Sequence, residues 1–533
     1  MTTFTVTYQG KKAQANLNVQ TSKLKKFFVN FRRQPGYNGE YGFDWLRDEY
    51  IHPIVTVSKD HNGAAFNAPL ALCEEVAAIK SEYKTKDVLN PISPHGIHYY
   101  PAWLTMYPDN AAAKITHGPS IQTNGIDLDI EIVALEALSQ DDTILIFESS
   151  NANIKISSSN DTNNPIEENK VVLNLKDFLG LKQIKSLGGS LKKEFYSTGI
   201  SINVKCIEVL DKNEEIRVTA KLDTEEVEVG QLMISKNSDY NDYTTDIYVI
   251  KSFLRDDVNF DKTAIDNELA KIGGITGLEN YLNQNSLNQA LIKVNLIYDP
   301  ELDWVFRKQS LINASNQADY NGMIDNQATM LMDPGKYMNY INDRFTLMYP
   351  KLVKKKAMFL YLTPFLSTTA GGASYNTPLE NKHIIIFKGN IDHLPSYAHE
   401  IGHTLGLEHS FEDDATLTKA DVIAQHEAKK VEYRRKIREH QAAKTKHLND
   451  NAAYYNANPA EKKEAVKTLN RNINIYKDAL KSTEDGITVT NNNILRFSSK
   501  NTENIMDYDL SNQKVFFKWQ SDIMRKEVKS YYH

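Results

Sequence analysis

The chain has 533 residues, of which 41% are hydrophobic and 24% are charged, and its formal net charge is −6. These values are typical of a globular protein with two to four domains, because a single core rarely extends beyond about 250–300 residues. They exclude a nucleic-acid-binding protein, since no basic stripe is present, and a disulfide-stapled fold, since the only cysteines are Cys73 and Cys206.

The first residues, MTTFTVTYQG, alternate apolar and polar side chains, which predicts a β-strand and not a secretory signal peptide. No run of 18 apolar residues occurs, so we expect no membrane span. We therefore expect a cytoplasmic protein or one exported by a route that needs no classical signal. A mature form whose signal has been removed fits the same observations.

Residues 1–110 mix strand-like and helix-like pieces, and ALCEEVAAIKSEYK (71–84) predicts a short amphipathic helix. We expect a small N-terminal α+β module here, with an aromatic-rich binding surface as the alternative. Residues 111–238 contain short runs rich in β-branched residues, such as IDLDIEIVAL and ISINVKCIEVL, between polar loops. That pattern predicts a β-rich, sandwich-like domain.

Residues 239–533 have a mixed pattern. Segments 247–254, 291–299, 357–365 and 383–389 are apolar enough for strands, and 277–290 has the pattern of a helix. Strands that alternate with helices predict an α/β domain. The whole chain is therefore expected to be a multidomain α+β protein.

A charged segment, residues 416–483, interrupts this last domain and predicts an inserted helical hairpin. Asn458 is a good N-cap, Pro459 suits the first helical position, and Glu461 stands where a capping box needs it. The apolar residues that follow have heptad spacing: Val466, Leu469, Ile473, Tyr476 and Leu480.

The segment HEIGHTLGLEH (399–409) carries the chemistry. On a helix, His399 and His403 project from one face, one turn apart, so both imidazoles can reach one Zn²⁺ ion at about 2.0–2.1 Å. Glu400 cannot share that ligand position, but it can act as general base on a zinc-activated water and then carry the proton to the leaving amine.

Gly406 tolerates positive φ, so it can end the helix and bring His409 back as a third ligand. Three protein ligands and one open position are typical of a catalytic zinc site. The competing interpretations are an amphipathic helix with three satisfied histidines and an inert zinc-binding relic. Glu400 argues against the relic, because a binding site alone does not need it.

About a hundred residues downstream, ENIMDYDL (503–510) contains Met506 and Tyr508. Together with the histidine motif, this segment resembles the Met-turn of metzincin zinc proteases. The resemblance implies that Met506 forms an apolar floor beneath the zinc. It also implies that Tyr508 either ligates the zinc or hydrogen-bonds the tetrahedral oxyanion.

Among metzincins, NIMDY followed by FFKWQSDIMR (516–525) is most similar to the pappalysin-type enzymes. Those enzymes carry disulfides and a calcium-binding loop between the third histidine and the Met-turn. Here the predicted helical hairpin occupies that interval and no cysteine lies in it. The resemblance therefore implies one catalytic Zn²⁺ ion, and calcium is not predicted.

The resemblance also gives a role to AGGASYN (370–376). Metzincins have an antiparallel edge strand above the cleft, to which an extended substrate adds as a further strand. Gly372, Ala373 and Ser374 are candidate substrate-binding residues on this basis, and a glycine-rich turn is the alternative.

The predicted function is thus a zinc metalloendopeptidase that acts on protein or peptide substrates. Because no signal peptide or disulfide framework is present, a bacterial-type effector fits, delivered by a secretion or injection apparatus through residues 1–235. One alternative is a zymogen whose N-terminal half is inhibitory, with Cys73 or Cys206 as a conceivable blocker of the zinc. Another is a non-catalytic zinc-containing binding protein.

Overall fold

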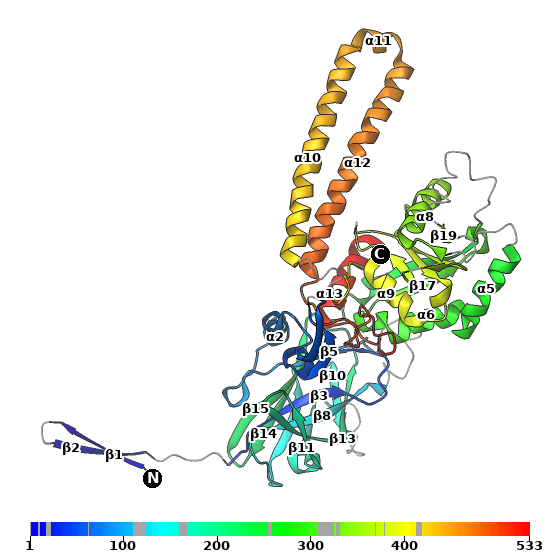
Figure 1. The fold of residues 1–533 in the computed structure, drawn as a ribbon. Coiled ribbons are helices and arrows are strands. Elements are labelled where there is room, and N and C mark those ends of the chain that lie inside the picture. Colours follow the sequence, from blue (N-terminus) through cyan, green and yellow to red (C-terminus); the bar gives the residue numbers. More distant parts are fainter. Residues whose placement is uncertain are drawn as a thin grey trace.

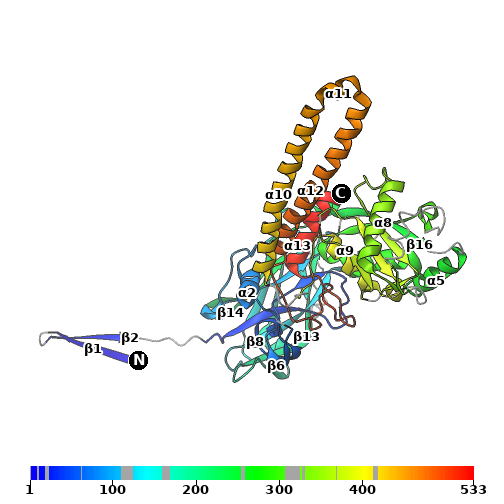
Figure 2. The same cartoon turned by 45° about the horizontal axis from the view of Figure 1, so that its top comes forward.

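The computed structural model describes residues 2–8, 11–17, 23–61, 63–109, 124–158, 168–253, 258–305, 324–326, 331–367, 369–377, 379–411 and 418–533. It is a mixed α/β protein with several sheets, which agrees with the predicted multidomain α+β class. A β-rich body and an α/β body lie side by side, and a long helical hairpin projects from the region where they meet (Figure 1). The turned view in Figure 2 shows the same arrangement.

Two sheets form the β-rich body and share one core. The first has the order β10-β13-β8-β3, with β12 paired to β13. Its strands are β3 (Phe27–Arg33), β8 (Ile126–Ala134), β10 (Ile154–Ser158), β12 (Lys182–Ser186) and β13 (Lys192–Cys206). The second has the order β11-β9-β14-β15-β7-β4. Its strands are β4 (Gly42–Asp44), β7 (Ala102–Thr105), β9 (Ile144–Ser149), β11 (Lys170–Asn174), β14 (Glu214–Leu222) and β15 (Glu225–Ile234).

Alternation along the strands builds this core. Leu128, Ile130 and Ile132 of β8 are buried on one face of the first sheet. Phe31 of the first sheet meets Phe147 of the second edge to face, with 6.1 Å between the ring centroids. The two sheets therefore pack against each other through their apolar faces.

The predicted boundary at residue 110 does not separate two cores in the described part of the chain. Strands β3, β4 and β7 belong to the two sheets of the β-rich body. The segment between β4 and β7 packs instead against the α/β body and contains α1 (Asp48–Ile51), α2 (Val76–Lys84) and the hairpin of β5 (Val55–Lys59) and β6 (Ala65–Leu70). Which body each segment joins depends on pairing between strands that are far apart in the chain. Local sequence patterns carry no information about that pairing.

A further hairpin, β1 (Thr2–Tyr8) with β2 (Lys11–Leu17), precedes these elements.

The α/β body has a mixed sheet with the order β17-β16-β21-β24-β23, and β18 pairs with β16. Its strands are β16 (Thr244–Phe253), β17 (Lys293–Tyr298), β18 (Trp304–Val305), β21 (Ala357–Thr363), β23 (Gly372–Ser374) and β24 (His383–Phe387). All pairs are parallel except the edge strand β23, which is antiparallel to β24. A small sheet of β19 (Ile324–Asn326), β20 (Leu331–Met332) and β22 (Leu366–Ser367) lies in the same body.

Helices cover both faces of this sheet. On one face packs α8 (Pro334–Met348). On the other pack α5 (Val258–Lys271), α6 (Gly274–Asn285) and α9 (Leu394–Thr404), with α13 (Lys518–Glu527) near them. Short 3₁₀ or π-helical turns complete the described chain: Pro94–Gly96, Leu175–Phe178, Tyr240–Tyr243, Leu287–Ala290, Pro300–Leu302, Lys388–Asn390 and Val528–Tyr532.

The second core is built from both halves of the chain. Side chains from residues 50–107 and from the α/β body form one buried cluster. The ring of Tyr50 illustrates the contact, since its centroid lies 4.9 Å from that of Phe497 and 5.8 Å from that of Phe517. Residues 50–107 are therefore part of the core beneath the C-terminal segments.

The inserted hairpin consists of α10 (Lys419–Asp450), α11 (Ala452–Ala457) and α12 (Pro459–Asn492). Ile473, in the predicted heptad stripe, is buried where α12 faces α10. None of the helices in the described residues has the length and apolarity needed to cross a bilayer.

The predicted capping box at the start of α12 does not form. The side chain of Asn458 donates back to the carbonyl of Tyr454, 3.0 Å away, and Glu461 accepts from the hydroxyl of Tyr454 instead. The neighbouring helix thus outcompetes the local cap. A capping box is present at the start of α10, between Thr418 and Asp421.

One ion-pair cluster joins Arg33 of the β-rich body to Glu503, and the stability of the fold should depend on pH through it. Burial alone would raise the pKa of Glu503, but the guanidinium groups of Arg47 and Arg33 outweigh it and hold that pKa at about 2. Because the folded pKa lies below the unfolded value of 4.5, the ionised cluster stabilises the fold above pH 4.5. That contribution, on the order of 3 kcal/mol, is lost as the pH falls toward 2.

Glu503→Gln should therefore lack this part of the pH dependence of unfolding. Chemical unfolding of wild type and variant between pH 5 and pH 2 measures it, with the exposed Glu432→Gln as control. Parallel stability curves for all three proteins would contradict the prediction.

Candidate metal centre

Helix α9 places two of the three histidines of the motif. Pro395 lies in its first turn, where a missing N–H costs nothing, and the helix ends at Thr404. Gly406 follows with φ +82°, and its N–H donates to the carbonyl of His403 at 2.9 Å. This reversal returns the chain to the same side of the helix.

The three imidazoles then converge. The Nε2 atom of His403 lies 3.1 Å from Nε2 of His399 and 3.2 Å from Nε2 of His409. All three candidate ligand atoms lie within 4.8 Å of one another. A group of three imidazole nitrogens this close together can hold a metal ion.

The hydrogen bonds of the rings fix which nitrogen is free to bind. The Nδ1 atom of His399 lies 2.8 Å from the carbonyl of Ile505, and Nδ1 of His403 lies 2.8 Å from that of Leu407. A carbonyl only accepts, so each Nδ1 carries the proton and each Nε2 directs a lone pair toward the common point. Burial, followed by the neighbouring His409 and His399, lowers the pKa of His403 well below its usual value, which keeps that ring in the neutral ligand form.

Residues 504–508, named the Met-turn segment for their resemblance in sequence, pack against helix α9. Met506 is fully buried, and its sulfur would lie 2.7 Å from a Cβ atom added to Gly402. The Tyr508 hydroxyl lies 2.9 Å from Nε2 of His409, and the Tyr508 side chain remains 42% exposed. The structure therefore brings the Met-turn residues and the three histidines together at one place.

Gly402→Ala should destabilise the protein by about 1–3 kcal/mol, because the added methyl group collides with the sulfur of Met506. Thermal unfolding measures the loss. Gly389→Ala is the matched control, since a Cβ atom there would meet only the Leu366 side chain at 3.7 Å. Equal melting temperatures for the two variants would refute the close approach of helix and turn.

Glu400 follows the first histidine and lines the same cleft. Burial raises the pKa of its carboxyl to about 8, against the opposing hydrogen bond from Ser374. The Ser374 hydroxyl lies 2.7 Å from a Glu400 carboxylate oxygen and 2.8 Å from its carbonyl oxygen. A Cβ atom on Gly372 would come within 2.7 Å of the Glu400 side chain. Both edge-strand residues therefore hold Glu400 in place.

The cleft has a volume of about 460 Å³. The edge strand β23, with Gly372, Ala373 and Ser374, forms one of its walls. The cleft is also lined by the three histidines, Glu400 and Tyr508. Cys73 and Cys206 are buried and unpaired, and neither lines the cleft as far as the structure describes it.

Comparisons with known proteins do not place the chain in a family. No protein-family model matches it, and no curated protein matches it. One similar solved chain belongs to a structure described as "Structure of a chaperone-substrate complex". The two are 16% identical, the match covers 39% of this chain and 28% of the length of the other, and the TM-score is 0.19. A TM-score this low identifies no common fold.

The root of the hairpin contacts the segment of the third histidine. Glu408 accepts from Thr490 at 3.0 Å and pairs with Arg496, whose guanidinium also donates to the carbonyl of His409 at 3.1 Å. Asn493 donates to the carbonyl of Gly406 at 2.9 Å. The insertion is thus anchored beside the metal centre.

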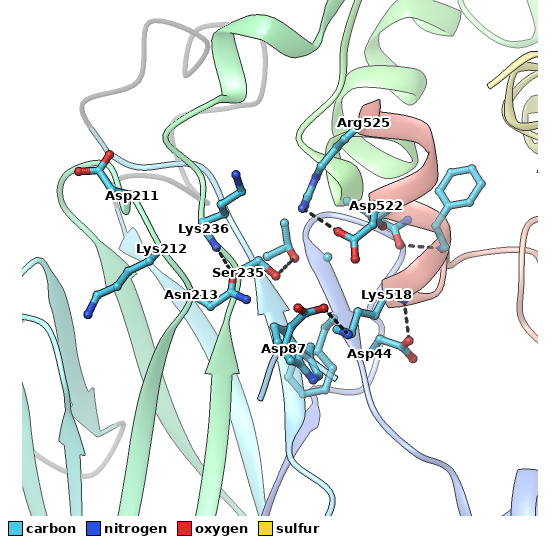
Figure 3. A pocket seen from close by; sticks show the side chains of 17 residues that line it. Asp44, Asp87, Asp211, Lys212, Asn213, Ser235, Lys236, Lys518, Asp522 and Arg525 are labelled. Carbon is cyan, nitrogen blue, oxygen red and sulfur yellow. Dashed lines mark hydrogen bonds and ion pairs between the residues drawn. The ribbon is translucent and has the colours of Figure 1, made fainter. Parts of the chain in front are cut away.

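A second cavity, of about 420 Å³, lies between the β-rich body and α13 (Figure 3). The backbone N–H of Lys518 donates to Asp44 at 2.8 Å, and its ammonium group lies 3.0 Å from Glu82. Arg525 pairs with Asp522 at 3.5 Å. Because Lys518 ties the start of α13 to Asp44 of β4, we interpret this cavity as a seam between the two bodies.

Two residues that shape the centre, Gly402 and Asp507, are not among those predicted from the sequence. A glycine inside the helical motif, at position 402, was the available signal for a close approach. Asp507 is fully buried and accepts from the backbone N–H groups of Lys500, Thr502 and Tyr508, so it shapes the Met-turn. No local pattern marks Asp507, because its partners belong to an irregular loop.

Proposed function

We propose that this chain is a zinc-dependent endopeptidase. The observation that carries the proposal is the convergence of the Nε2 atoms of three histidines with the Glu400 carboxyl in one cleft. Nitrogen ligands suit Zn²⁺, and three protein ligands leave a fourth position open for catalysis. The resemblance to metzincins supports the same choice of metal.

The residues of the cleft divide the work of peptide hydrolysis. A zinc ion held by His399, His403 and His409 would lower the pKa of a water molecule to about 7 and would polarise the substrate carbonyl. Glu400, whose raised pKa suits proton exchange near neutral pH, accepts the proton of the attacking water and delivers it to the leaving amine. The hydroxyl of Tyr508 donates to the developing oxyanion. The edge of β23 binds the extended peptide as an added strand.

Removal of the metal tests the proposal. Chelation followed by dialysis should abolish cleavage of unfolded casein, and one equivalent of Zn²⁺ should restore it. When the free Zn²⁺ concentration is a hundred times the dissociation constant, metal binding should also stabilise the fold by about 2.7 kcal/mol. Metal analysis and mass spectrometry of the peptide products provide the readouts. Casein cleavage that continues in metal-free protein would overturn the assignment.

A further inference from the structure

Two arginines, Arg33 at the end of β3 and Arg47 just after β4, reach the residue before the Met-turn segment. The Nη2 atom of Arg33 lies 2.7 Å from both carboxylate oxygens of Glu503, and Arg47 pairs with the same carboxylate. Arg47 is only 5% exposed. Their guanidinium carbons lie 4.8 Å and 4.0 Å from the ring centroid of Trp45, which spaces them. The cluster joins residues that are more than 450 positions apart in the chain.

Arg47 is held from its other side as well. Its Nη1 atom lies 3.0 Å from Asp44, whose second oxygen accepts from the backbone N–H of Lys518 at 2.8 Å. Figure 3 shows Asp44 beneath the start of α13 with this contact. Asp44 and Arg47 therefore bind the two ends of the segment 503–518, at Lys518 and at Glu503. This segment contains the Met-turn segment.

From Glu503 the contacts lead directly to a histidine of the centre. Asn504, fully buried, accepts from the N–H of Met506 at 2.9 Å. The next carbonyl, of Ile505, accepts from Nδ1 of His399 at 2.8 Å. Partners of this kind set the tautomer and the orientation of a metal-binding histidine.

We propose that Arg33 and Arg47 are positioning residues of the metal centre, which hold the Met-turn through Glu503. The β-rich body then serves the centre itself, because it keeps the Ile505 carbonyl in place beneath His399. The catalytic part of this inference rests on the proposed function. The metal-binding part stands on the histidine cluster alone.

The test uses the full chain with Co²⁺ as the probe. Arg47→Gln, Arg33→Gln and Glu503→Gln should each weaken Co²⁺ binding by about 10–100-fold in competition with a chelator. They should also change the Co²⁺ absorption spectrum, which reports ligand geometry. On casein, kcat should fall and KM should stay near the wild-type value.

Arg32→Gln is the matched control. Arg32 lies 5.7 Å from the same Trp45 ring, but it pairs with Glu131, at 2.7 Å, and not with Glu503 in the described part of the chain. It should lose stability without losing metal affinity. If Arg47→Gln does not fold, Arg33→Gln and the conservative Arg47→Lys, which keeps the charge, carry the test.

Wild-type Co²⁺ affinity and an unchanged spectrum in folded Arg33→Gln and Glu503→Gln would overturn the inference, and so would a wild type that binds no metal. Wild type that binds Co²⁺ but never cleaves casein would overturn only the proposed function, and the affinities would still decide this inference.

Discussion

Glu400→Gln is expected to lower the rate of peptide hydrolysis by about 10²–10⁴-fold while the protein keeps its metal. The amide has nearly the same shape as the carboxyl and still fits against Ser374 and Gly372. It cannot accept the proton of the attacking water. Initial rates on a fluorogenic peptide, with the zinc content of each preparation measured in parallel, give the result.

Glu432→Gln on the exposed side of α10 controls for the loss of a carboxylate elsewhere. Zinc at wild-type stoichiometry together with undiminished hydrolysis by Glu400→Gln would exclude Glu400 as the general base. Absence of hydrolysis in zinc-loaded wild type on several unfolded substrates would instead favour the non-catalytic binding protein.

Removal of residues 1–235 is expected to prevent the rest of the chain from folding. Ten buried side chains from that half belong to the core that also contains Ile401 and Met506: Tyr50, Val57, Leu72, Cys73, Ile79, Tyr83, Val88, Trp103, Tyr107 and Met233. Full burial of a large apolar side chain contributes about 1.5–3 kcal/mol, so their loss exceeds the roughly 5–15 kcal/mol that stabilises a typical protein.

The expected product is an insoluble or non-cooperatively unfolding fragment, as measured by circular dichroism and thermal melting. Co-expression of residues 1–235 as a separate chain should restore soluble protein, which separates loss of core from loss of expression. A soluble, active fragment 236–533 would instead support the zymogen alternative. Delivery through residues 1–235 stays a prediction from the sequence.

The centre was largely predictable because its geometry is local. The spacing of His399 and His403 is one helical turn, and Gly406 supplies the reversal that positions His409. Met506 and Tyr508 came from the family resemblance, and the structure places Met506 against Gly402, inside the histidine motif, and Tyr508 against His409. The strands near 247–254 and 291–299, the helix near 277–290 and the helical hairpin were also predictable, since each follows its own periodicity, but helix α5 was not predicted.

The division into two bodies was not predictable, because it depends on contacts between residues that are far apart in the chain. Strand β3 pairs with β8, about a hundred residues later, and β7 pairs in parallel with β15. Nothing in the sequence of β3 or β7 states these partners. The ion-pair cluster on Glu503 was not predictable either. In the sequence Arg33 and Arg47 look like ordinary surface cations, and only the fold brings them to Glu503.

The hairpin has a mechanical consequence. At 1.5 Å per residue, α12 is about 50 Å long, and α10 packs along it as a second rod. Thr490 at its root donates to Glu408, and Arg496, just after α12, donates to the carbonyl of His409. A paired rod fixed at one end is a lever, so a load applied at the α11 tip acts as a torque on the loop of His409. The position of His409 is thus mechanically linked to the hairpin tip, which lies far from the centre.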